Sequence, residues 1–410
     1  MMILVLAGGY DQIALIKEIK KYDNRVLLAD YFENPPAKKY ADEFFKISTL
    51  DEAAIFSLAK EKQVDLITTA CTDQALLTVA RVSEMLGLPC YISSKTAQNV
   101  TNKAYMKKMF EKNNIPTAEF HILNNGNMDL IDRIQKREQY PYIVKPCDCN
   151  SSKGVIKVID KEQLKQAVKN AFDLSRSKKV IVERYIEGAE ISIDAWVDMG
   201  KCQILSMSKT NKILENDTSF TIYQSEYPTK ISDKIFDKMK VVLDKICQSF
   251  KLENCPLLVQ AIVDKENLYV IEFSTRMGGG SKYKFMEYIS GIDIIEKYVD
   301  FILGRNIIKL RPRISEKFYE IDYIYAKTGI ISKLINFEEL KQTGLIKELF
   351  MYKSKGDVIK KMETSSDRIL GMMLEANSKE ELLQKRNKVL SLTRIENEKG
   401  ENIMYKECFI

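Results

Sequence analysis

Short apolar runs alternate with amphipathic segments over the first ninety residues, and this alternation restricts the possible folds more than any other feature. Strands are predicted at Met2–Leu6, Arg25–Ala29 and Leu66–Ala70. Amphipathic helices are predicted between and after them, at Gln12–Lys21, Asp51–Lys60 and Gln74–Leu86. Strands that alternate with helices predict a parallel sheet with ligands at the carboxyl ends of the strands. Because the sequence changes character near Ser93, we expect a first domain over residues 1–94.

The turn at Gly8 and Gly9 lies at such a strand end and invites a dinucleotide-binding interpretation. The full G-x-G-x-x-G fingerprint is missing, because Asp11, Gln12 and Ile13 occupy the positions that follow. The phosphate loop G-x-x-x-x-G-K-[ST] is also absent from the sequence. We therefore do not expect a nicotinamide, flavin or phosphate-loop nucleotide site at this turn.

Composition excludes several further classes. The chain has 410 residues and a formal charge of +6, with lysines scattered beside glutamates rather than clustered with aromatic residues. We therefore expect no nucleic-acid partner. Apolar runs stay well short of the ~20 residues that a membrane helix needs, and no targeting segment is evident, so we expect no membrane association and a cytoplasmic location. The sequence leaves a homodimer open.

The cysteines and the single histidine argue against metal and nucleophilic centres that use those residues. Eight cysteines in a chain of this length do not form a disulfide framework, and Cys147 and Cys149 lack a second pair. His121 lies between apolar residues and is interpreted as a packed strand residue. A zinc site, a Ser-His-Asp triad and a Cys-His dyad are therefore disfavoured.

The middle of the chain predicts a small α+β module followed by a strand-rich region. One helix is predicted over Thr96–Asn113, and a polar loop at Cys147–Gly154 separates two short strands. Further on, the predicted elements are strands at Ile191–Val197 and Ile204–Ser208, a helix at Asp233–Phe250, strands at Leu257–Asp264 and Leu268–Ser274, and a helical region at Tyr283–Leu303. Pro312 marks the last expected boundary, before about a hundred residues that contain strands.

The strand pair that ends near Glu272 is the strongest local signal for chemistry. An antiparallel register that pairs Asp264 with Leu268 also pairs Gln260 with Glu272. The two-residue period then places Gln260, Glu272 and Ser274 on one face, with Ile271 and Phe273 turned into a core. Oxygen ligands on a rigid hairpin suit Mg²⁺, although Glu272 considered alone is better interpreted as an ordinary strand residue.

Basic and glycine residues near this hairpin strengthen the functional interpretation. Arg276 and the run Gly278-Gly279-Gly280 follow within eight residues of Glu272. Arginine offers a bidentate fork to a carboxylate or phosphate, and glycine lets the backbone approach an anion. Upstream, Lys103 lies near a helix start, and Lys145 ends an apolar strand, where a lysine is uncommon without an anionic partner.

In this order and spacing, the motifs resemble those of the ATP-grasp superfamily over roughly residues 95–310. The motifs that carry the resemblance are Asn102-Lys103, Tyr142–Pro146, Ser151–Gly154, Val182–Gly188 with Glu190, and Ile271–Arg276. The resemblance implies an α/β and α+β multidomain protein. It would have a Rossmann-like N-terminal domain at 1–94, an ATP-grasp core at 95–310 with a mobile lid at about 115–186, and a small C-terminal α+β domain at 311–410.

The resemblance also implies the activity and the residues that carry it. ATP and Mg²⁺, for which Mn²⁺ could substitute, would activate a carboxylate as an acyl phosphate, which an amine then attacks. The implied ATP-binding residues are Lys103, Lys145, Ser151, Ser152, Gly154, Glu183, Ile186 and Glu190. Gln260, Glu272 and Ser274 would hold the metal, Arg276 would stabilise the transferring group, and Gly278, Gly279 and Gly280 would face the carboxylate substrate.

Two positions depart from the usual family pattern. Ser274 stands where an asparagine is usual, and Gln260 stands where many members have an acidic residue. Both changes weaken metal ligation, so the number of tightly bound Mg²⁺ ions stays open. Carboxylate–amine ligation of an amino acid or a similar small metabolite fits best. The alternatives are a bicarbonate-activating enzyme of the carbamoyl type and a nucleotide-binding regulator without turnover.

Overall fold

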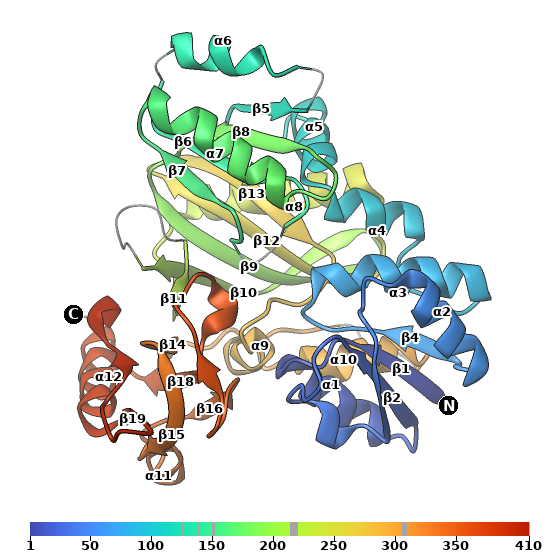
Figure 1. Cartoon of the computed structure of the whole chain (residues 1–410), viewed down its shortest axis with the longest axis vertical. Coiled ribbons are helices and arrows are strands. Elements are labelled where there is room, and N and C mark those ends of the chain that lie inside the picture. The colour runs from blue at the N-terminus through green and yellow to red at the C-terminus, as the bar shows by residue number, and fades with distance from the viewer. Residues whose placement is uncertain (125–126, 138, 150–151, 214–219, 306–309, 410) are drawn as a thin grey trace.

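The computed structural model describes residues 1–124, 127–137, 139–149, 152–213, 220–305 and 310–409 (Figure 1). The N-terminal sheet is parallel, in the order β3-β2-β1-β4, and its strands β1, β2 and β4 correspond to the three predicted ones. The elements of this part are β1 (Met2–Leu6), α1 (Asp11–Lys20), β2 (Arg25–Asp30), β3 (Glu43–Lys46), α2 (Glu52–Glu61), β4 (Leu66–Thr68) and α3 (Asp73–Leu86). The alternation of strand and helix is confirmed.

The helix predicted over Thr96–Asn113 is wrong in one respect, because the structure divides it into α4 (Ser94–Thr101) and α5 (Lys103–Lys112). Asn102 has extended backbone angles, and its side chain accepts a hydrogen bond of 3.0 Å from the Tyr105 amide. Asn102 therefore caps a new helix, and the cap places Lys103 in its first turn.

The module that follows forms its own antiparallel sheet, in the order β5-β8-β6-β7, and its own hydrophobic core. We call this part the lid module. Its elements are β5 (Phe120–Leu123), α6 (Leu130–Arg137), β6 (Tyr142–Pro146), β7 (Ile156–Val158), α7 (Lys161–Leu174) and β8 (Val180–Arg184). Figure 1 shows it above the long central sheet, at the end of the molecule away from the N-terminal sheet.

The central sheet extends through both later segments of the chain, in the order β13-β12-β9-β10-β11-β14-β18-β16. Its first part contains β9 (Ala189–Asp198), β10 (Lys201–Lys212), β11 (Ile222–Tyr227), α8 (Asp233–Phe250), β12 (Cys255–Asp264), β13 (Asn267–Ser274), α9 (Lys282–Ser290) and α10 (Ile294–Ile302). The C-terminal part contains β14 (Phe318–Ala326), β15 (Gly329–Ile335), α11 (Phe337–Gln342), β16 (Glu348–Met351), β17 (Val358–Ile359), β18 (Leu370–Ala376), α12 (Lys379–Leu392), β19 (Arg394–Asn397) and β20 (Met404–Tyr405).

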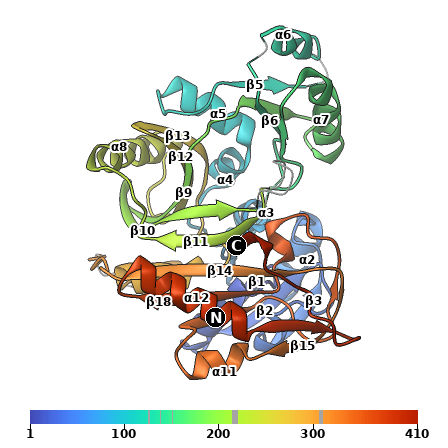
Figure 2. The same ribbon diagram turned by 90° about the vertical axis from the view of Figure 1, so that its left-hand side faces the viewer.

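One pairing joins the segment expected as the core to the segment expected as a small C-terminal domain. Strand β11 pairs antiparallel with β14, from Gln224 opposite Asp322 to Tyr227 opposite Tyr319. Figure 2 shows β11 and β14 as neighbours beneath β10. The same sheet therefore runs across the expected boundary near residue 310, and the domain limits remain a prediction.

A shared hydrophobic cluster holds the N-terminal sheet against the rest of the molecule. Ile3 of β1 and Tyr298 of α10 belong to it, together with Trp196 of β9. The Trp196 side chain is 1% exposed and lies edge-on to Phe301, with ring centroids 5.6 Å apart. Since burial of large aromatic surface is a main source of folding energy, this cluster fixes where the N-terminal sheet docks.

Candidate active site

A cavity of about 430 Å³ lies between the lid module and the central sheet. Seven lysine or arginine side chains and three glutamates line it. The basic residues are Lys103, Lys107, Lys145, Lys157, Arg184, Lys209 and Lys212, and the acidic ones are Glu183, Glu190 and Glu272. This excess of positive charge in a concave site favours a ligand with several negative charges, such as a nucleoside polyphosphate.

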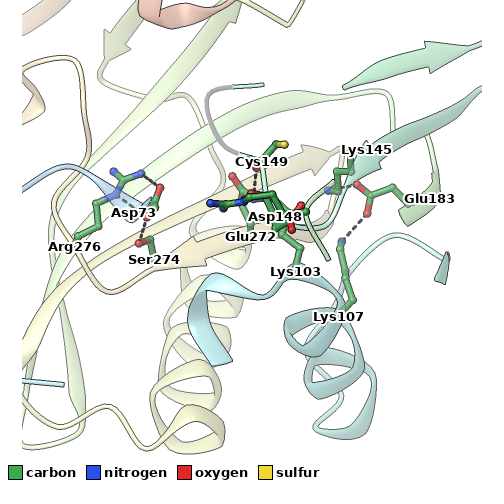
Figure 3. A network of polar contacts seen from close by, with 11 residues as sticks. Asp73, Lys103, Lys107, Lys145, Asp148, Cys149, Glu183, Glu272, Ser274 and Arg276 are labelled. Carbon is green, nitrogen blue, oxygen red and sulfur yellow. Dashed lines mark hydrogen bonds and ion pairs between the residues drawn. The ribbon is translucent and has the colours of Figure 1, made fainter. Parts of the chain in front are cut away.

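Glu183 lies between two buried lysines (Figure 3). Its carboxylate forms an ion pair with Lys145 at the end of β6, and another with Lys107 of α5 at 2.8 Å. Burial alone would raise the pKa of Glu183, but Lys107 and Lys145 lower it to about 2. A lysine at the end of an apolar strand was expected to have an anionic partner, and for Lys145 this partner is Glu183. Lys107 and Lys145 share its single carboxylate.

Lys103 occupies the next place along the cavity. Its ammonium group lies 3.0 Å from the Glu272 carboxylate and donates a hydrogen bond of 3.0 Å to the carbonyl oxygen of Cys149. Burial would raise the pKa of Glu272, but Lys103 and then Lys145 lower it, so the carboxylate is charged. Lys103 thus connects the β12–β13 hairpin to the polar loop of the lid module.

The hairpin brings Gln260 opposite Glu272, as predicted, but by a different route. The turn pairs Asp264 with Asn267 rather than with Leu268, so the predicted register is wrong by one residue near the turn. A β-bulge between Gln260 and Ala261 restores the offset, and Gln260 pairs with Glu272 beyond it. A bulge adds one residue to one strand and turns the side chains that follow.

The bulge also corrects the expected core position of Ile271. Val270 and Phe273 are buried in the hydrophobic core on the far side of the sheet. Ile271 is outside that core and lines the cavity beside Glu272. Because the extra residue lies at this point of β13, two consecutive side chains are directed to the ligand side.

A polar recess of about 30 Å³ adjoins the cavity and gathers the predicted metal ligands. Gln260, Glu272 and Ser274 line it, together with Arg276 and Asp73. The recess has room for a water molecule or a small ion. The structure therefore brings together the four predicted residues of the hairpin and its exit.

Asp73, at the start of α3, is a residue of this recess that the sequence interpretation missed. Its carboxylate accepts a hydrogen bond of 2.8 Å from Nε of Arg276, a second one from Nη2, and another from the Ser274 hydroxyl (Figure 3). Burial would raise the pKa of Asp73, but Arg276 lowers it. The signal was present, since Asp73 follows the third predicted strand at its carboxyl end.

The recess fits a divalent ion only together with further ligands. The described residues contain no group of three histidine, cysteine, aspartate or glutamate side chains placed to hold a metal. Glu272 supplies one carboxylate, and Gln260 and Ser274 supply neutral oxygens. Mg²⁺ commonly binds through one or two carboxylates, with phosphate oxygens and waters as its other ligands. The donor set is therefore compatible with Mg²⁺ that arrives with a nucleotide.

The structure describes two of the three residues that were predicted to bind ATP from the polar loop of the lid module. Ser151 lies outside the described residues. Ser152 lines the cavity, and its hydroxyl donates a hydrogen bond of 3.3 Å to the carbonyl oxygen of Phe220. Gly154 has a φ of +75°, and a Cβ there would collide with the Leu174 and Pro146 side chains. A larger residue at Gly154 would therefore displace the loop.

The segment after β8 also lines the cavity. Ile186 and Glu190 both line it, and the Glu190 carboxylate forms an ion pair with Lys212. Gly188 lies between them, where a Cβ would collide with the carbonyl oxygen of Val263. The absence of a side chain at Gly188 lets the segment pack against β12.

The glycine turn before α9 is enclosed on two of its three residues. A Cβ on Gly278 would collide with the Asp194 carboxylate, and one on Gly280 would collide with Arg368 and Tyr323. Gly279 is open by comparison, since a Cβ there would have its nearest neighbour 3.7 Å away. Asp11 of α1 fixes the turn, since it accepts hydrogen bonds from the Gly280 and Ser281 amides at 3.1 and 2.9 Å.

Two more charged residues near the turn were not singled out by the sequence interpretation. Asp194 of β9 is 1% exposed, and burial raises its pKa. Lys282 donates a hydrogen bond of 3.2 Å to the Ser208 hydroxyl, and burial lowers its pKa. Neither carries a local signal, because Asp194 lies inside a predicted strand and Lys282 directly precedes a predicted helical region.

The chain thus combines a parallel α/β part, the lid module and a cavity lined by basic residues next to a polar hairpin. Residues 138–284 match the family model described as an ATP-grasp domain. The chain therefore contains an ATP-grasp domain over these residues. The described residues include no helix that is both long and apolar enough to cross a membrane.

Relatives of known name support the same assignment. A D-alanine–D-alanine ligase of Acetivibrio thermocellus is 28% identical over 254 residues, which cover 56% of this chain and 64% of the relative. The first four curated relatives are matched over only 51% to 65% of their own lengths. A phosphoribosylamine–glycine ligase of Methanosphaera stadtmanae is 23% identical over 413 residues, which cover 92% of this chain and 90% of the relative.

The fold is shared over almost the whole chain. The crystal structure of an L-amino acid ligase from Bacillus licheniformis superposes with a TM-score of 0.79. The match covers 97% of this chain and 98% of that one, at 19% sequence identity. At this low sequence identity, the match shows that the two chains share a fold.

Proposed function

We propose that the protein is an ADP-forming ligase that uses ATP to activate a carboxylate as an acyl phosphate and couples it to an amine. The observation that carries this proposal is that the polar recess adjoins the basic cavity and shares Lys103, Gln260 and Glu272 with it. A polyphosphate held along Lys103, Lys107 and Lys145 would present its terminal phosphate to Glu272 and Arg276. The names of these relatives, which are all ligases, agree with this assignment.

The roles of the side chains follow from their places in the cavity. Lys103 and Lys145 bind the phosphates, which compete with Glu272 and Glu183 for the two ammonium groups. The backbone of the Glu183–Ile186 segment faces the adenine, and Glu190 faces the ribose. The loop from Ser151 to Gly154 covers the phosphates from the lid side. Positioning and charge stabilisation of this kind supply most of the catalysis in phosphoryl transfer.

Gln260, Glu272 and Ser274 would hold Mg²⁺, which neutralises phosphate charge when bound. Arg276 stabilises the charge on the transferring phosphoryl group, and Asp73 holds its guanidinium toward the recess. In the first step a substrate carboxylate oxygen attacks the γ-phosphorus, and ADP leaves. In the second step the amine nitrogen attacks the acyl carbon, the C–O bond to phosphate breaks, and the nitrogen loses a proton.

Phosphate release from ATP tests the proposal. The purified protein is incubated with MgATP and pairs of amino acids, and inorganic phosphate and ADP are measured. We expect release that depends on both members of a pair and gives one ADP per bond formed. The variant Glu272→Gln should be inactive, and Glu162→Gln, an exposed substitution on α7, should match the wild type.

Each other outcome assigns a different function. Release with bicarbonate alone would replace the proposal by a bicarbonate-activating enzyme. ATP binding without release for any pair or for bicarbonate would indicate a nucleotide-binding regulator, an alternative that the weaker ligands Gln260 and Ser274 favour. Release in Glu272→Gln equal to that of the wild type would contradict the assigned site.

A further inference from the structure

Three parts of the chain meet at the glycine turn, and two of them hold the backbone of Gly280, one at its amide and the other at its carbonyl oxygen. The Asp11 carboxylate of α1 accepts a hydrogen bond from the Gly280 amide at 3.1 Å. The Tyr323 hydroxyl of β14 donates one of 2.9 Å to the Gly280 carbonyl oxygen. The Ser281 hydroxyl lies 3.0 Å from that of Tyr352. Figure 1 shows α9, which this turn opens, between the N-terminal sheet and the C-terminal segment.

Arg368 adds a cation to this junction. Its guanidinium carbon lies 4.1 Å from the centre of the Tyr323 ring and 5.7 Å from that of Tyr352. A side chain at Gly280 would collide with its Nη1 atom. A planar guanidinium stacked on an aromatic face keeps its N–H edge free for a bidentate partner. Because Gly280 has no side chain, the Nη1 atom of Arg368 can pack against its backbone.

Arg368 lacks the partner that a cation in such a place requires. Its Nε is buried and donates to no acceptor among the residues that the structure describes. The polar groups around it are the hydroxyls of Tyr323, Tyr325 and Tyr352. Within the described part of the chain no carboxylate forms an ion pair with it, although Asp11 is near enough for their charges to interact. A guanidinium cannot lose its charge, so burial without an anion is costly.

Two other partly buried arginines have carboxylate partners. Arg276 is paired with Asp73, and Arg386 of α12 lies 3.2 Å from Glu320. Arg368 is also separate from the proposed nucleotide site, because it lines neither the cavity nor the recess. The turn that it contacts begins directly after Arg276, however, so a molecule bound there would lie beside the acyl phosphate.

We propose that Arg368 binds the carboxylate of the substrate that supplies the amine, which makes this substrate an amino acid rather than a simple amine. The inference rests on the proposed ligase function, because it assigns the second of its two substrates. The charges of Arg276 and Arg368 both act on the ammonium group of Lys282, so this junction lies close to the residue assigned to the transferring group.

Binding measurements test the proposal without turnover. The full-length protein is saturated with MgADP, and its Tm is measured by differential scanning fluorimetry against a series of common α-amino acids, with the decarboxylated amine and the amide of each. We expect at least one amino acid to raise the Tm of the wild type, while its decarboxylated amine and its amide bind about 10- to 100-fold more weakly, since both lack the charged carboxylate.

Two variants place the effect at Arg368. Arg368→Lys keeps the charge but loses the bidentate fork, so it should weaken amino-acid binding about 10-fold or more and leave MgADP affinity unchanged. Arg386→Lys is the matched control, since it changes a partly buried arginine of the same C-terminal part that already has a carboxylate partner. It should bind amino acids as the wild type does. Circular dichroism spectra verify that both variants are folded.

The outcomes separate this proposal from the proposed function. If no amino acid binds the wild type, if amines and amides bind equally well, or if Arg368→Lys binds amino acids normally, Arg368 is not a carboxylate receptor. The wild-type comparison of amino acid with amine decides this even if Arg368→Lys does not fold. Amino-acid binding that depends on Arg368 without phosphate release would support the receptor and contradict the ligase.

Discussion

At the scale of single residues, the proposed phosphate site is a balance of buried charges. Lys107 and Lys145 share the Glu183 carboxylate, and Lys103 pairs with Glu272. The lysines therefore exceed their acidic partners before any ligand arrives. Because unbalanced buried charge destabilises a protein, an anionic ligand that binds these lysines should stabilise the folded state. Variants of the charged residues can measure this effect.

Replacement of Lys145 by alanine should weaken ATP binding about 10- to 150-fold, because a hydrogen bond to a charged group contributes roughly 1.5–3 kcal/mol. Isothermal titration calorimetry with a non-hydrolysable ATP analogue measures the change. Lys165→Ala is the control, since Lys165 is an exposed lid lysine paired with Asp132 at 3.4 Å. Unchanged affinity in a folded Lys145→Ala protein would remove this residue from the phosphate site.

Replacement of Glu183 by glutamine should destabilise the ligand-free protein by about 3–5 kcal/mol at pH 7, because two buried ammonium groups lose their counter-charge. Urea unfolding measures this loss, with the exposed substitution Glu162→Gln as control. Saturating ATP analogue should stabilise the variant more than the wild type. Equal stabilisation of both proteins would argue that phosphate does not replace the Glu183 charge.

The same variant has a predicted pH dependence. The pKa of Glu183 is about 2 in the folded protein, below its ordinary value of 4.5. A lowered carboxyl pKa stabilises the folded state fully above pH 4.5, and this stabilisation is lost as the pH falls toward 2. The stability difference between wild type and Glu183→Gln should therefore be constant near neutral pH and shrink below pH 4.5. A difference that grows on acidification would reverse the assigned sign.

At the scale of elements, the hairpin β12–β13 determines the proposed metal site. Its bulge puts Glu272, Gln260 and Ser274 around one recess, while Val270 and Phe273 stay in the core. We expect Glu272→Gln to abolish turnover at millimolar Mg²⁺ with the fold intact, because an amide supplies only a dipole where a carboxylate supplies a charge. Gln260→Ala should cost less, and Ser274→Asn should lower the Mg²⁺ concentration for half-maximal phosphate release.

Mg²⁺ titrations of phosphate release, with circular dichroism as folding control, decide among these variants. Wild-type Mg²⁺ dependence in Glu272→Gln would mean that the hairpin is purely structural. A rise in the Mg²⁺ requirement of Ser274→Asn would instead contradict the ligand role of position 274, since asparagine restores a stronger oxygen donor.

The lid module is a second element with a testable behaviour. Its sheet and core are its own, and Lys103 contacts its loop through the Cys149 carbonyl oxygen. We expect the amides of residues 147–149 and 152–154 to exchange more slowly when an ATP analogue binds, because closure over phosphates would bury them. Hydrogen exchange detected by mass spectrometry tests this. Unaltered exchange of the loop at saturating analogue would refute closure.

At the scale of the whole molecule, the single tryptophan reports how the N-terminal sheet docks. Trp196 belongs to β9, but its hydrophobic cluster includes Ile3 of β1. We expect Ile3→Ala to cost about 2–5 kcal/mol and to lower the urea midpoint of Trp196 fluorescence by the corresponding amount. Leu123→Ala, in the separate core of the lid module, is the matched control.

Leu123→Ala should shift the Trp196 transition less than Ile3→Ala does, because the two clusters share no residue. Equal shifts would mean that the lid module and the N-terminal sheet unfold as one unit. No shift with Ile3→Ala would mean that the N-terminal sheet unfolds without disturbing Trp196.

The sequence by itself determined the elements and the order of the chemical motifs. The alternation of the first ninety residues predicted the parallel sheet, and the limits of β6 and α8 agree with the predicted segments. These features depend on side-chain period and on neighbours close in the chain, which a sequence displays directly.

Only the tertiary structure decided which distant charges meet. Asp73 and Arg276 are 203 residues apart, and nothing local couples them. The bulge at Ile271 and the pairing of β11 with β14 are likewise set by packing. Arg368 is the clearest case, because its sequence neighbours carry no motif, and its surroundings come from three separate parts of the chain. Long-range contacts of this kind are set by how the sheets close on one another, and a local pattern does not encode them.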